Sequence, residues 1–191
     1  MNMTKEAAQK TVDEVFSLYE KWGQEDYIGE PVSQLEHMVQ AAQLAESEGY
    51  DDEVILAAFF HDIGHLAGHL MPVEKMEGAG VLDHETIAAD YLREKGFPEK
   101  ICLLVASHVQ AKRYLTYKYP EYYQRLSPAS KTTLSYQGGV MTPDEAQAFE
   151  KDEWHSLYLK FREWDDKAKV ENMQLVPLDK YRQIAIACLV R

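Results

Sequence analysis

The segment DDEVILAAFFHDIGH, residues 51–65, decides the fold class of this 191-residue chain. Its middle is apolar on nearly every side, so a helix made from it has no solvent face and belongs at the centre of a bundle. Its end carries three polar residues: His61, Asp62 and His65. We therefore expect a central helix that ends in side chains able to bind a metal or move a proton.

Helical periodicity continues on both sides of this segment. Val12, Val15, Phe16 and Tyr19 follow the spacing of one helical face, and a second helix begins at Ser33 with a capping box. The remaining helices are expected over residues 83–96, 98–115, 120–126, 127–134, 142–150, 153–168 and 177–190. Convincing strand periodicity is missing from the sequence. These patterns predict an all-α fold of about eight to ten helices, a single domain over residues 1–191.

Composition narrows the possible partners and locations. The chain has 32 Asp+Glu against 20 Lys+Arg, a formal charge of −12, which argues against nucleic acid and anionic membranes as partners. It contains no apolar run of about 20 residues and does not begin like a secretory signal, so we expect a cytoplasmic protein. No obligate protein partner is evident. Cys102 and Cys188 lie in apolar helical patterns, which predicts buried thiols.

Histidines and aspartates recur on successive predicted helices. The apolar neighbours of His37 suggest that it faces inward, and the candidate metal ligands together are His37, His61, Asp62, His84, His108 and Asp165. Imidazoles and carboxylates without a thiolate suit metals such as iron or manganese, and Asp62 could bridge two of them. His69 and His155 fit no such pattern, so we expect surface or hydrogen-bonded roles for them.

The order of these residues resembles the HD-domain superfamily in its binuclear form, which is all-α. Most members of that superfamily are phosphohydrolases, but the closer resemblance is to its mixed-valent diiron oxygenases that cleave the C–P bond of hydroxyphosphonates. The motifs that carry this resemblance are DYIGEPVSQLEH (26–37), HDIGH (61–65), HE (84–85), SHVQAKRYL (107–115), LSPASKTTLSYQGG (126–139) and REWDDKAK (162–169). The histidine at position 65 also favours the oxygenase branch, since many hydrolytic relatives have lysine there.

The resemblance implies two iron ions, Fe(II) and Fe(III), with O₂ as co-substrate. One iron would be held by His37, His61, Asp62 and Asp165, and the other by Asp62, His84 and His108. It also implies that Tyr27 caps an iron in the absence of substrate and that His65 acts as an acid/base near the bound hydroxyl. Glu30 would sense the substrate nitrogen, and Ser130 would contact the phosphonate.

Helical spacing adds two cations to this list. Lys112 lies four residues after His108, and Arg162 lies three before Asp165, so each shares a face with a proposed ligand and could bind the phosphonate.

The expected substrate is a small zwitterionic phosphonate. The resemblance favours (R)-1-hydroxy-2-(trimethylammonio)ethylphosphonate, giving glycine betaine and phosphate. One alternative is 2-amino-1-hydroxyethylphosphonate, giving glycine and phosphate. Another is a metal-dependent HD phosphohydrolase of a nucleotide or phosphomonoester, and a third is a non-catalytic sensor of a small zwitterion.

Overall fold

The computed structural model describes residues 3–27 and 29–190, and over these residues the chain forms twelve α-helices and one short hairpin. The helices are α1 (Lys5–Trp22), α2 (Gln34–Ser47), α3 (Asp52–Phe60), α4 (Ile63–Ala67), α5 (His84–Glu94), α6 (Glu99–Val105), α7 (Ser107–Lys118), α8 (Pro120–Arg125), α9 (Pro128–Tyr136), α10 (Pro143–Glu150), α11 (His155–Lys167) and α12 (Leu178–Val190). The predicted all-α class is confirmed.

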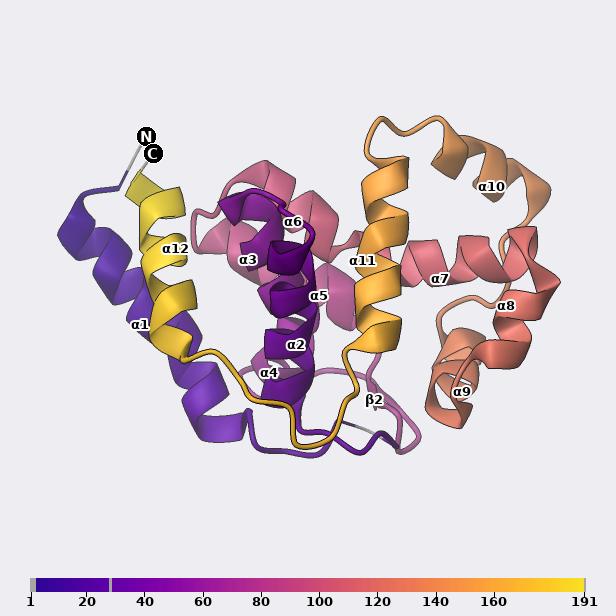
Figure 1. Cartoon of the computed structure of the whole chain (residues 1–191), viewed down its shortest axis with the longest axis horizontal. Coiled ribbons are helices and arrows are strands. Elements are labelled where there is room, and N and C mark those ends of the chain that lie inside the picture. Colours follow the sequence, from indigo (N-terminus) through magenta and orange to yellow (C-terminus); the bar gives the residue numbers. More distant parts are fainter. Residues whose placement is uncertain (1–2, 28, 191) are drawn as a thin grey trace.

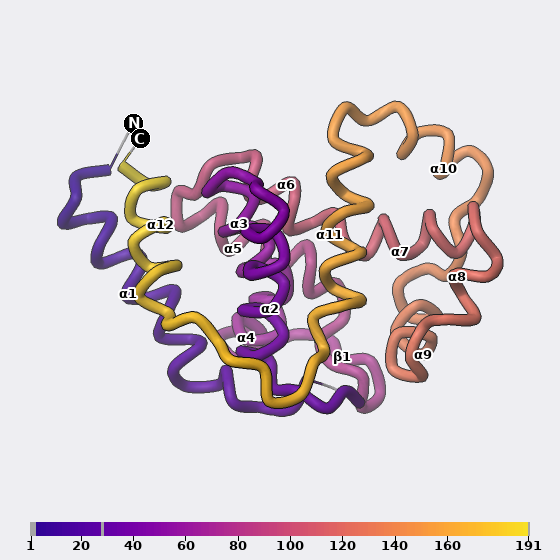
Figure 2. The backbone as a smooth tube through the Cα atoms, in the orientation of Figure 1, coloured from indigo at the N-terminus to yellow at the C-terminus, as the bar shows by residue number. Residues whose placement is uncertain are grey.

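The helices form a central group flanked on both sides (Figure 1). Helix α3 packs against α2, α6 and α12, and its seven residues from Val54 to Phe60 are all buried. At one end α1 lies beside α12, which brings the two ends of the described chain together. At the other end α8, α9 and α10 extend away from the centre beyond α7, as the backbone trace shows (Figure 2).

Twelve helices exceed the expected eight to ten because two predicted helices are each broken in two. The segment 51–65 divides into α3 and α4 at His61 and Asp62, and the segment 98–115 divides into α6 and α7 at Ala106. Side chains compete for main-chain carbonyls at both breaks: Nδ1 of His61 lies 2.8 Å from the Ala58 oxygen, and Ser107 donates to the Leu104 oxygen. The breaks therefore lie beside candidate metal ligands.

A two-stranded antiparallel hairpin was not predicted. Strands β1 (Lys75–Met76) and β2 (Gly80–Val81) have two residues each, too few to produce an alternating pattern in the sequence. The turn between them contains Gly78 at a φ of 75°.

The predicted capping box and the predicted burial of both cysteines are confirmed. Ser33 and Glu36 form the capping box that begins α2. Cys102 and Cys188 are buried thiols. Within the described ranges, no helix combines the length and the apolar character needed to cross a membrane.

Candidate metal centre

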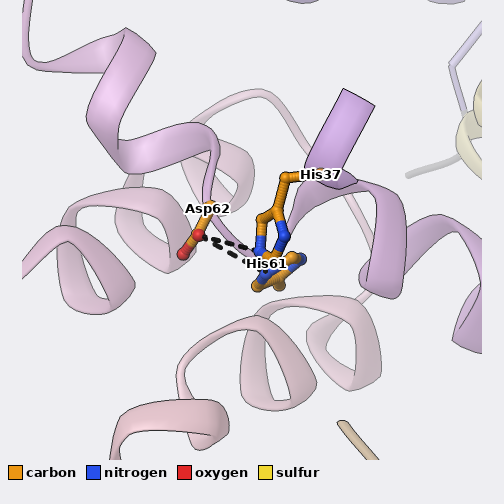
Figure 3. Close-up of side chains that lie close together, drawn as sticks. All are labelled: His37, His61 and Asp62. Atoms are coloured by element: carbon orange, nitrogen blue, oxygen red, sulfur yellow. Dashed lines mark hydrogen bonds and ion pairs between the residues drawn. The ribbon is translucent and has the colours of Figure 1, made fainter. Parts of the chain in front are cut away.

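The carboxylate of Asp62 lies between two pairs of histidines. Its Oδ2 is 3.4 Å from Nε2 of both His37 and His61, and its Oδ1 is 3.2 Å from Nε2 of His84 and 3.3 Å from that of His108. Figure 3 shows the first pair converging on Asp62. All five side chains are buried, and they form two groups with metal-ligand spacing that share Asp62. The structure thus brings five of the six predicted ligands together in two groups, and the sixth, Asp165, lies beside the first group.

Backbone carbonyls orient all four imidazoles. Nδ1 of His37 lies 2.9 Å from the Ala168 oxygen, and the other three rings use the carbonyl three residues earlier in the chain. A carbonyl oxygen only accepts, so each Nδ1 carries a proton, and in the neutral ring Nε2 presents a lone pair toward Asp62. Such outer contacts fix ring orientation in metal sites.

The ring nitrogens lie too close together for neutral histidines alone. Nε2 of His37 is 3.0 Å from that of His61, and Nε2 of His84 is 2.9 Å from that of His108. Lone pairs that face each other at these distances repel unless a proton or a metal ion lies between them. Oδ1 of Asp62 and Oδ1 of Asp165 are also buried without a hydrogen-bond partner. This donor set fits bound metal ions, which would satisfy nitrogens and oxygens together.

The buried carboxylates of the centre favour positively charged groups beside them. Histidines hold the pKa of Asp62 well below its usual range against the opposing effect of burial. Burial acts to lower the pKa of His37, but Asp165 and Asp62 outweigh it and raise that pKa to about 9. Buried carboxylates require compensation of this kind, and in a metal-loaded protein the cation supplies it in place of a proton.

Close backbone packing fixes the position of His84. A Cβ added to Gly64 in α4 would lie 1.9 Å from the main-chain oxygen of His84, so only glycine allows α4 to approach α5 this closely. Asp83, directly before His84, adopts a left-handed conformation at φ 55° that non-glycine residues rarely take. Both features hold one ligand against the segment that carries Asp62.

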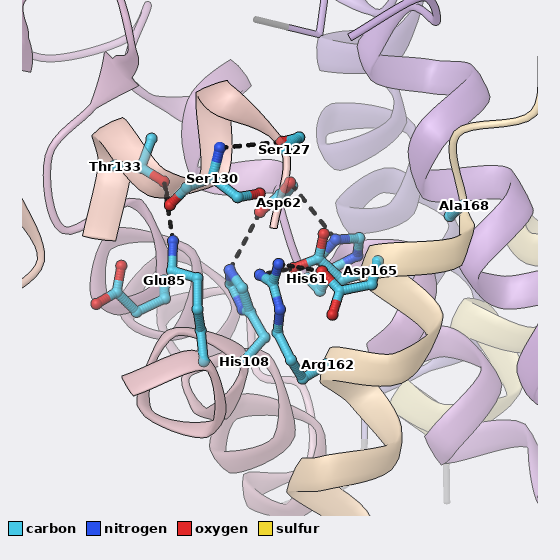
Figure 4. A network of polar contacts seen from close by, with 12 residues as sticks. His61, Asp62, Glu85, His108, Ser127, Ser130, Thr133, Arg162, Asp165 and Ala168 are labelled. Carbon is cyan, nitrogen blue, oxygen red and sulfur yellow. Dashed lines mark hydrogen bonds and ion pairs between the residues drawn. The ribbon is translucent and has the colours of Figure 1, made fainter. Parts of the chain in front are cut away.

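Asp165 completes one side of the centre from α11. Its Oδ1 lies 3.5 Å from Nε2 of His37, and its Oδ2 accepts a hydrogen bond of 2.6 Å from Arg162 (Figure 4). Arg162 is buried and also donates to Tyr122 and to Asp166. Three of its five N–H groups are therefore engaged by protein, and one of them orients Asp165.

A pocket borders the centre. Every predicted site residue other than His37 and His61 lines it, and those two lie behind Asp62 in the interior. Lys112 is a buried residue of the pocket lining, and its ammonium lies 2.8 Å from Oγ1 of Thr133 in α9. Ser130 lies one turn earlier in α9, close to its amino-terminal end. Burial and the neighbouring Arg162 lower the pKa of Lys112 to about 7.

Tyr27 and Glu30 come from a loop that folds back on itself. The backbone N–H of Glu30 donates to the Tyr27 oxygen, and that of Tyr27 donates to the Val32 oxygen. The Tyr27 ring stacks on His37 with centroids 3.9 Å apart, which places it directly against a metal ligand. Glu30 accepts a hydrogen bond from Ser127, so the loop is attached to the start of α9.

His65 faces the pocket as a neutral imidazole. Its ring stacks on His84 at 4.1 Å, and its Nδ1 accepts a hydrogen bond from the backbone N–H of Val81. Burial and the positive field of His84 lower its pKa to about 3. With Nδ1 occupied as an acceptor, the ring proton is on Nε2, so His65 can donate a hydrogen bond.

Sequence reasoning missed several residues of this site. Thr133 and Gln34 line the pocket, Tyr122 and Asp166 bind Arg162, and Lys169 pairs with Glu30. Lys169 and Asp166 belong to the motif REWDDKAK, but the sequence contains no signal for their long-range partners. Lys169 pairs with Glu30, 139 residues away, and Asp166 accepts a hydrogen bond from Tyr122, 44 residues away. His69 and His155 lie outside the pocket lining, and His69 pairs with Glu25 near the surface.

Comparison with known proteins agrees with this geometry. The sequence model of the HD domain matches residues 35–147, more than half of the chain. An uncharacterised protein of Acanthamoeba polyphaga mimivirus is 46% identical over 98% of this chain and 86% of its own length. The [1-hydroxy-2-(trimethylamino)ethyl]phosphonate dioxygenase (glycine-betaine-forming) of Leisingera caerulea is 38% identical over 85% of this chain and 82% of its own length. The hydroxymethylphosphonate dioxygenase of Gimesia maris is 38% identical over 93% and 88%.

Proposed function

The chain belongs to the HD-domain family, and from that premise we propose that it is a diiron dioxygenase that cleaves the C–P bond of a small 1-hydroxyphosphonate. The observation that carries the proposal is the carboxylate of Asp62 between two histidine pairs, a donor set for two adjacent metal ions. The names of two relatives supply the reaction class. We further propose that residues 1–191 form one domain, because one apolar core includes side chains from Ala8 to Leu189.

We assign the iron ligands as the sequence predicted. His37, His61, Asp62 and Asp165 would hold one ion, and Asp62, His84 and His108 the other. When bound, the iron pair would activate O₂ and anchor the oxygens of the substrate. Arg162 orients Asp165 for this task, because its guanidinium holds the oxygen of Asp165 that does not face His37.

The phosphonate end of the substrate would be bound by the wall formed by α7 and α9. Lys112 supplies a positive charge whose ammonium already points at Thr133, and Ser130 supplies a hydroxyl on the same side of the pocket. An acidic chain can therefore bind a small anion through local charge. We propose that Arg162 contributes mainly its positive field here, since three of its five N–H groups are engaged by protein.

Tyr27, His65 and Glu30 would act at the reacting end. The contact of Tyr27 with His37 supports a role as the group that covers an iron until substrate displaces it. His65 would donate the Nε2 proton in a hydrogen bond to a substrate oxygen and so orient the hydroxyl. Glu30 would face the substituent on the carbon next to the hydroxyl carbon, where the favoured substrate carries its nitrogen.

The favoured substrate is (R)-1-hydroxy-2-(trimethylammonio)ethylphosphonate, which would give glycine betaine and phosphate, as the name of the Leisingera relative suggests. The primary amine 2-amino-1-hydroxyethylphosphonate is the alternative. The Gimesia relative adds hydroxymethylphosphonate, which has no nitrogen, to the compounds that need testing. We propose that the protein is located in the cytoplasm.

One assay tests the function. Iron-loaded protein is mixed with each of the three hydroxyphosphonates, with and without O₂, and phosphate is measured. We expect phosphate only when both iron and O₂ are present, and none from Asp62→Ala. Phosphate release from a nucleotide or phosphomonoester without O₂, supported by Mn²⁺, would instead establish a phosphohydrolase. Binding of a zwitterion without turnover, unchanged in Asp62→Ala, would establish a sensor.

A further inference from the structure

Lys169, which forms an ion pair with Glu30 next to the pocket, has no role in the proposed mechanism. The ammonium of Lys169 lies 2.9 Å from Oε1 of Glu30 and 5.8 Å from the centre of the Tyr27 ring. Both members of the pair are largely shielded from water, with side-chain exposures of 14% for Lys169 and 10% for Glu30. Ion pairs with this degree of burial are screened far less than surface pairs.

Lys169 is held in place by the segment that contains a metal ligand. The residue before it, Ala168, provides the carbonyl that accepts from Nδ1 of His37. The residue after it, Val170, exchanges two hydrogen bonds with the buried side chain of Gln40, one turn further along α2. These contacts on both sides fix the backbone from which the Lys169 side chain reaches Glu30.

The Glu30 side chain lies between two cavities. Glu30 lines the substrate pocket, whereas Lys169 lines a second cavity together with Ser127. Lys169 and the hydroxyl of Ser127 both contact Oε1 of Glu30. The carboxylate that the pocket presents is therefore compensated from behind, and this part of the pocket carries no net charge.

We propose that Lys169 determines the charge preference of the pocket by neutralising Glu30, and so sets how strongly a cationic hydroxyphosphonate is preferred over one without a cation. The inference rests on the proposed function, because it assumes that the pocket binds hydroxyphosphonates. A substrate cation beside Glu30 meets the field of a paired carboxylate, which attracts it weakly. Without Lys169 the same carboxylate would attract the cation fully.

The test compares two substrates that differ in this charge. For each protein variant, kcat and KM are measured aerobically with 1-hydroxy-2-(trimethylammonio)ethylphosphonate and with hydroxymethylphosphonate, and Kd is measured anaerobically by calorimetry on the iron-loaded protein. We expect Lys169→Met to raise the preference for the cationic substrate by roughly tenfold or more, through KM and Kd and not through kcat. Glu30→Gln should move the preference in the opposite direction, because it leaves Lys169 uncompensated.

Two further variants separate charge from structure. Lys169→Arg keeps the charge and should keep the wild-type preference. Lys167→Met removes an equally positive side chain two residues away that pairs with Glu163 at the surface, and it should also leave the preference unchanged.

Three results would overturn the proposal: an unchanged preference in Lys169→Met, the same shift in Lys169→Arg as in Lys169→Met, or equal shifts in both Met variants. If Lys169→Met does not fold, a shift by Glu30→Gln toward the cationic substrate overturns it. Absence of turnover in the wild type would refute the proposed function, while the ratio of the two anaerobic Kd values still tests the charge preference of the pocket.

Discussion

Nε2 of His37 and Nε2 of His61 lie 3.0 Å apart in the interior, while Nδ1 of each ring faces a backbone carbonyl. The same arrangement recurs for His84 and His108 at 2.9 Å. Two rings held with their lone pairs toward each other are a strained arrangement without a cation and a favourable one with it. Both halves of the centre thus have the donor geometry of a metal site, and Asp62 connects them.

Asp62→Asn should therefore remove metal from both halves of the centre. An amide cannot supply the bridging negative charge, so we expect most of the bound iron to be lost, as measured by metal analysis of purified protein. Asp83→Asn is the matched control, because Asp83 is exposed, adjoins His84 and has a left-handed conformation that asparagine tolerates. Full metal content in Asp62→Asn would contradict the bridging role.

Gly64→Ala should damage the centre without changing any ligand. The new Cβ would meet the main-chain oxygen of His84 at 1.9 Å, so α4 and α5 must separate. We expect a loss of about 1–3 kcal/mol in the free energy of unfolding, together with weaker metal binding. Chemical denaturation and metal titration would measure the two effects.

Gly139→Ala is the control for Gly64→Ala, because it strains the backbone without creating a new contact at the centre. Its Cβ would meet nothing within 4 Å, but its φ is 68°, so it should lower stability by about 1 kcal/mol while metal binding stays normal. Equal metal affinity in both alanine variants would show that the contact between Gly64 and His84 does not support the centre.

Lys112 should make phosphonate binding depend on pH. Its pKa of about 7 in the folded protein lies below the ordinary 10.5, so the ammonium is present below pH 7 and is lost above it. Affinity for a hydroxyphosphonate should therefore fall as pH rises through 7, by up to about tenfold per pH unit. Calorimetry across pH 6–9 would measure this fall. Lys112→Arg, which stays charged, should flatten the profile, and an unaltered profile in that variant would exclude Lys112 as the cause.

The same pKa shift predicts a change in stability. Lysine in the unfolded chain keeps its proton up to about pH 10.5, so between pH 7 and 10.5 the unfolded state binds more protons than the folded state. The contribution of Lys112 to the free energy of unfolding therefore rises with pH across this range. Subtracting the denaturation profile of Lys112→Met from that of the wild type isolates this contribution, and a difference that falls with pH would be inconsistent with a depressed pKa.

Tyr27→Phe should change the spectrum of the substrate-free iron protein. The ring stacks on His37, so its phenol oxygen is the group that we propose to reach an iron. We expect the variant to lose the tyrosinate-to-iron absorption while keeping its metal, since phenylalanine preserves the stacking. An identical visible spectrum in wild type and variant would exclude this role for Tyr27.

Much of the fold could be predicted because it depends on local patterns, and the residues proposed as ligands follow from those patterns together with the family resemblance. The apolar run ahead of His61 predicts a central helix, and spacing within helices predicts that Lys112 shares a face with His108. The motifs indicate the family in the same way. The two helix breaks were missed because His61 and Ser107 bond main-chain carbonyls with their side chains, and helical periodicity carries no sign of that competition.

The sequence by itself determined which residues are available for chemistry: four histidines and two aspartates in apolar helical settings, with a basic residue near two of them. Only the tertiary structure decided their partners. It turned the two oxygens of Asp62 toward different histidine pairs, engaged Arg162 with Tyr122 across 40 residues, and placed Lys169 against Glu30 across 139 residues. The physical reason is that charge pairing and ligand geometry depend on distances of a few ångströms between segments remote in sequence, which local periodicity does not encode.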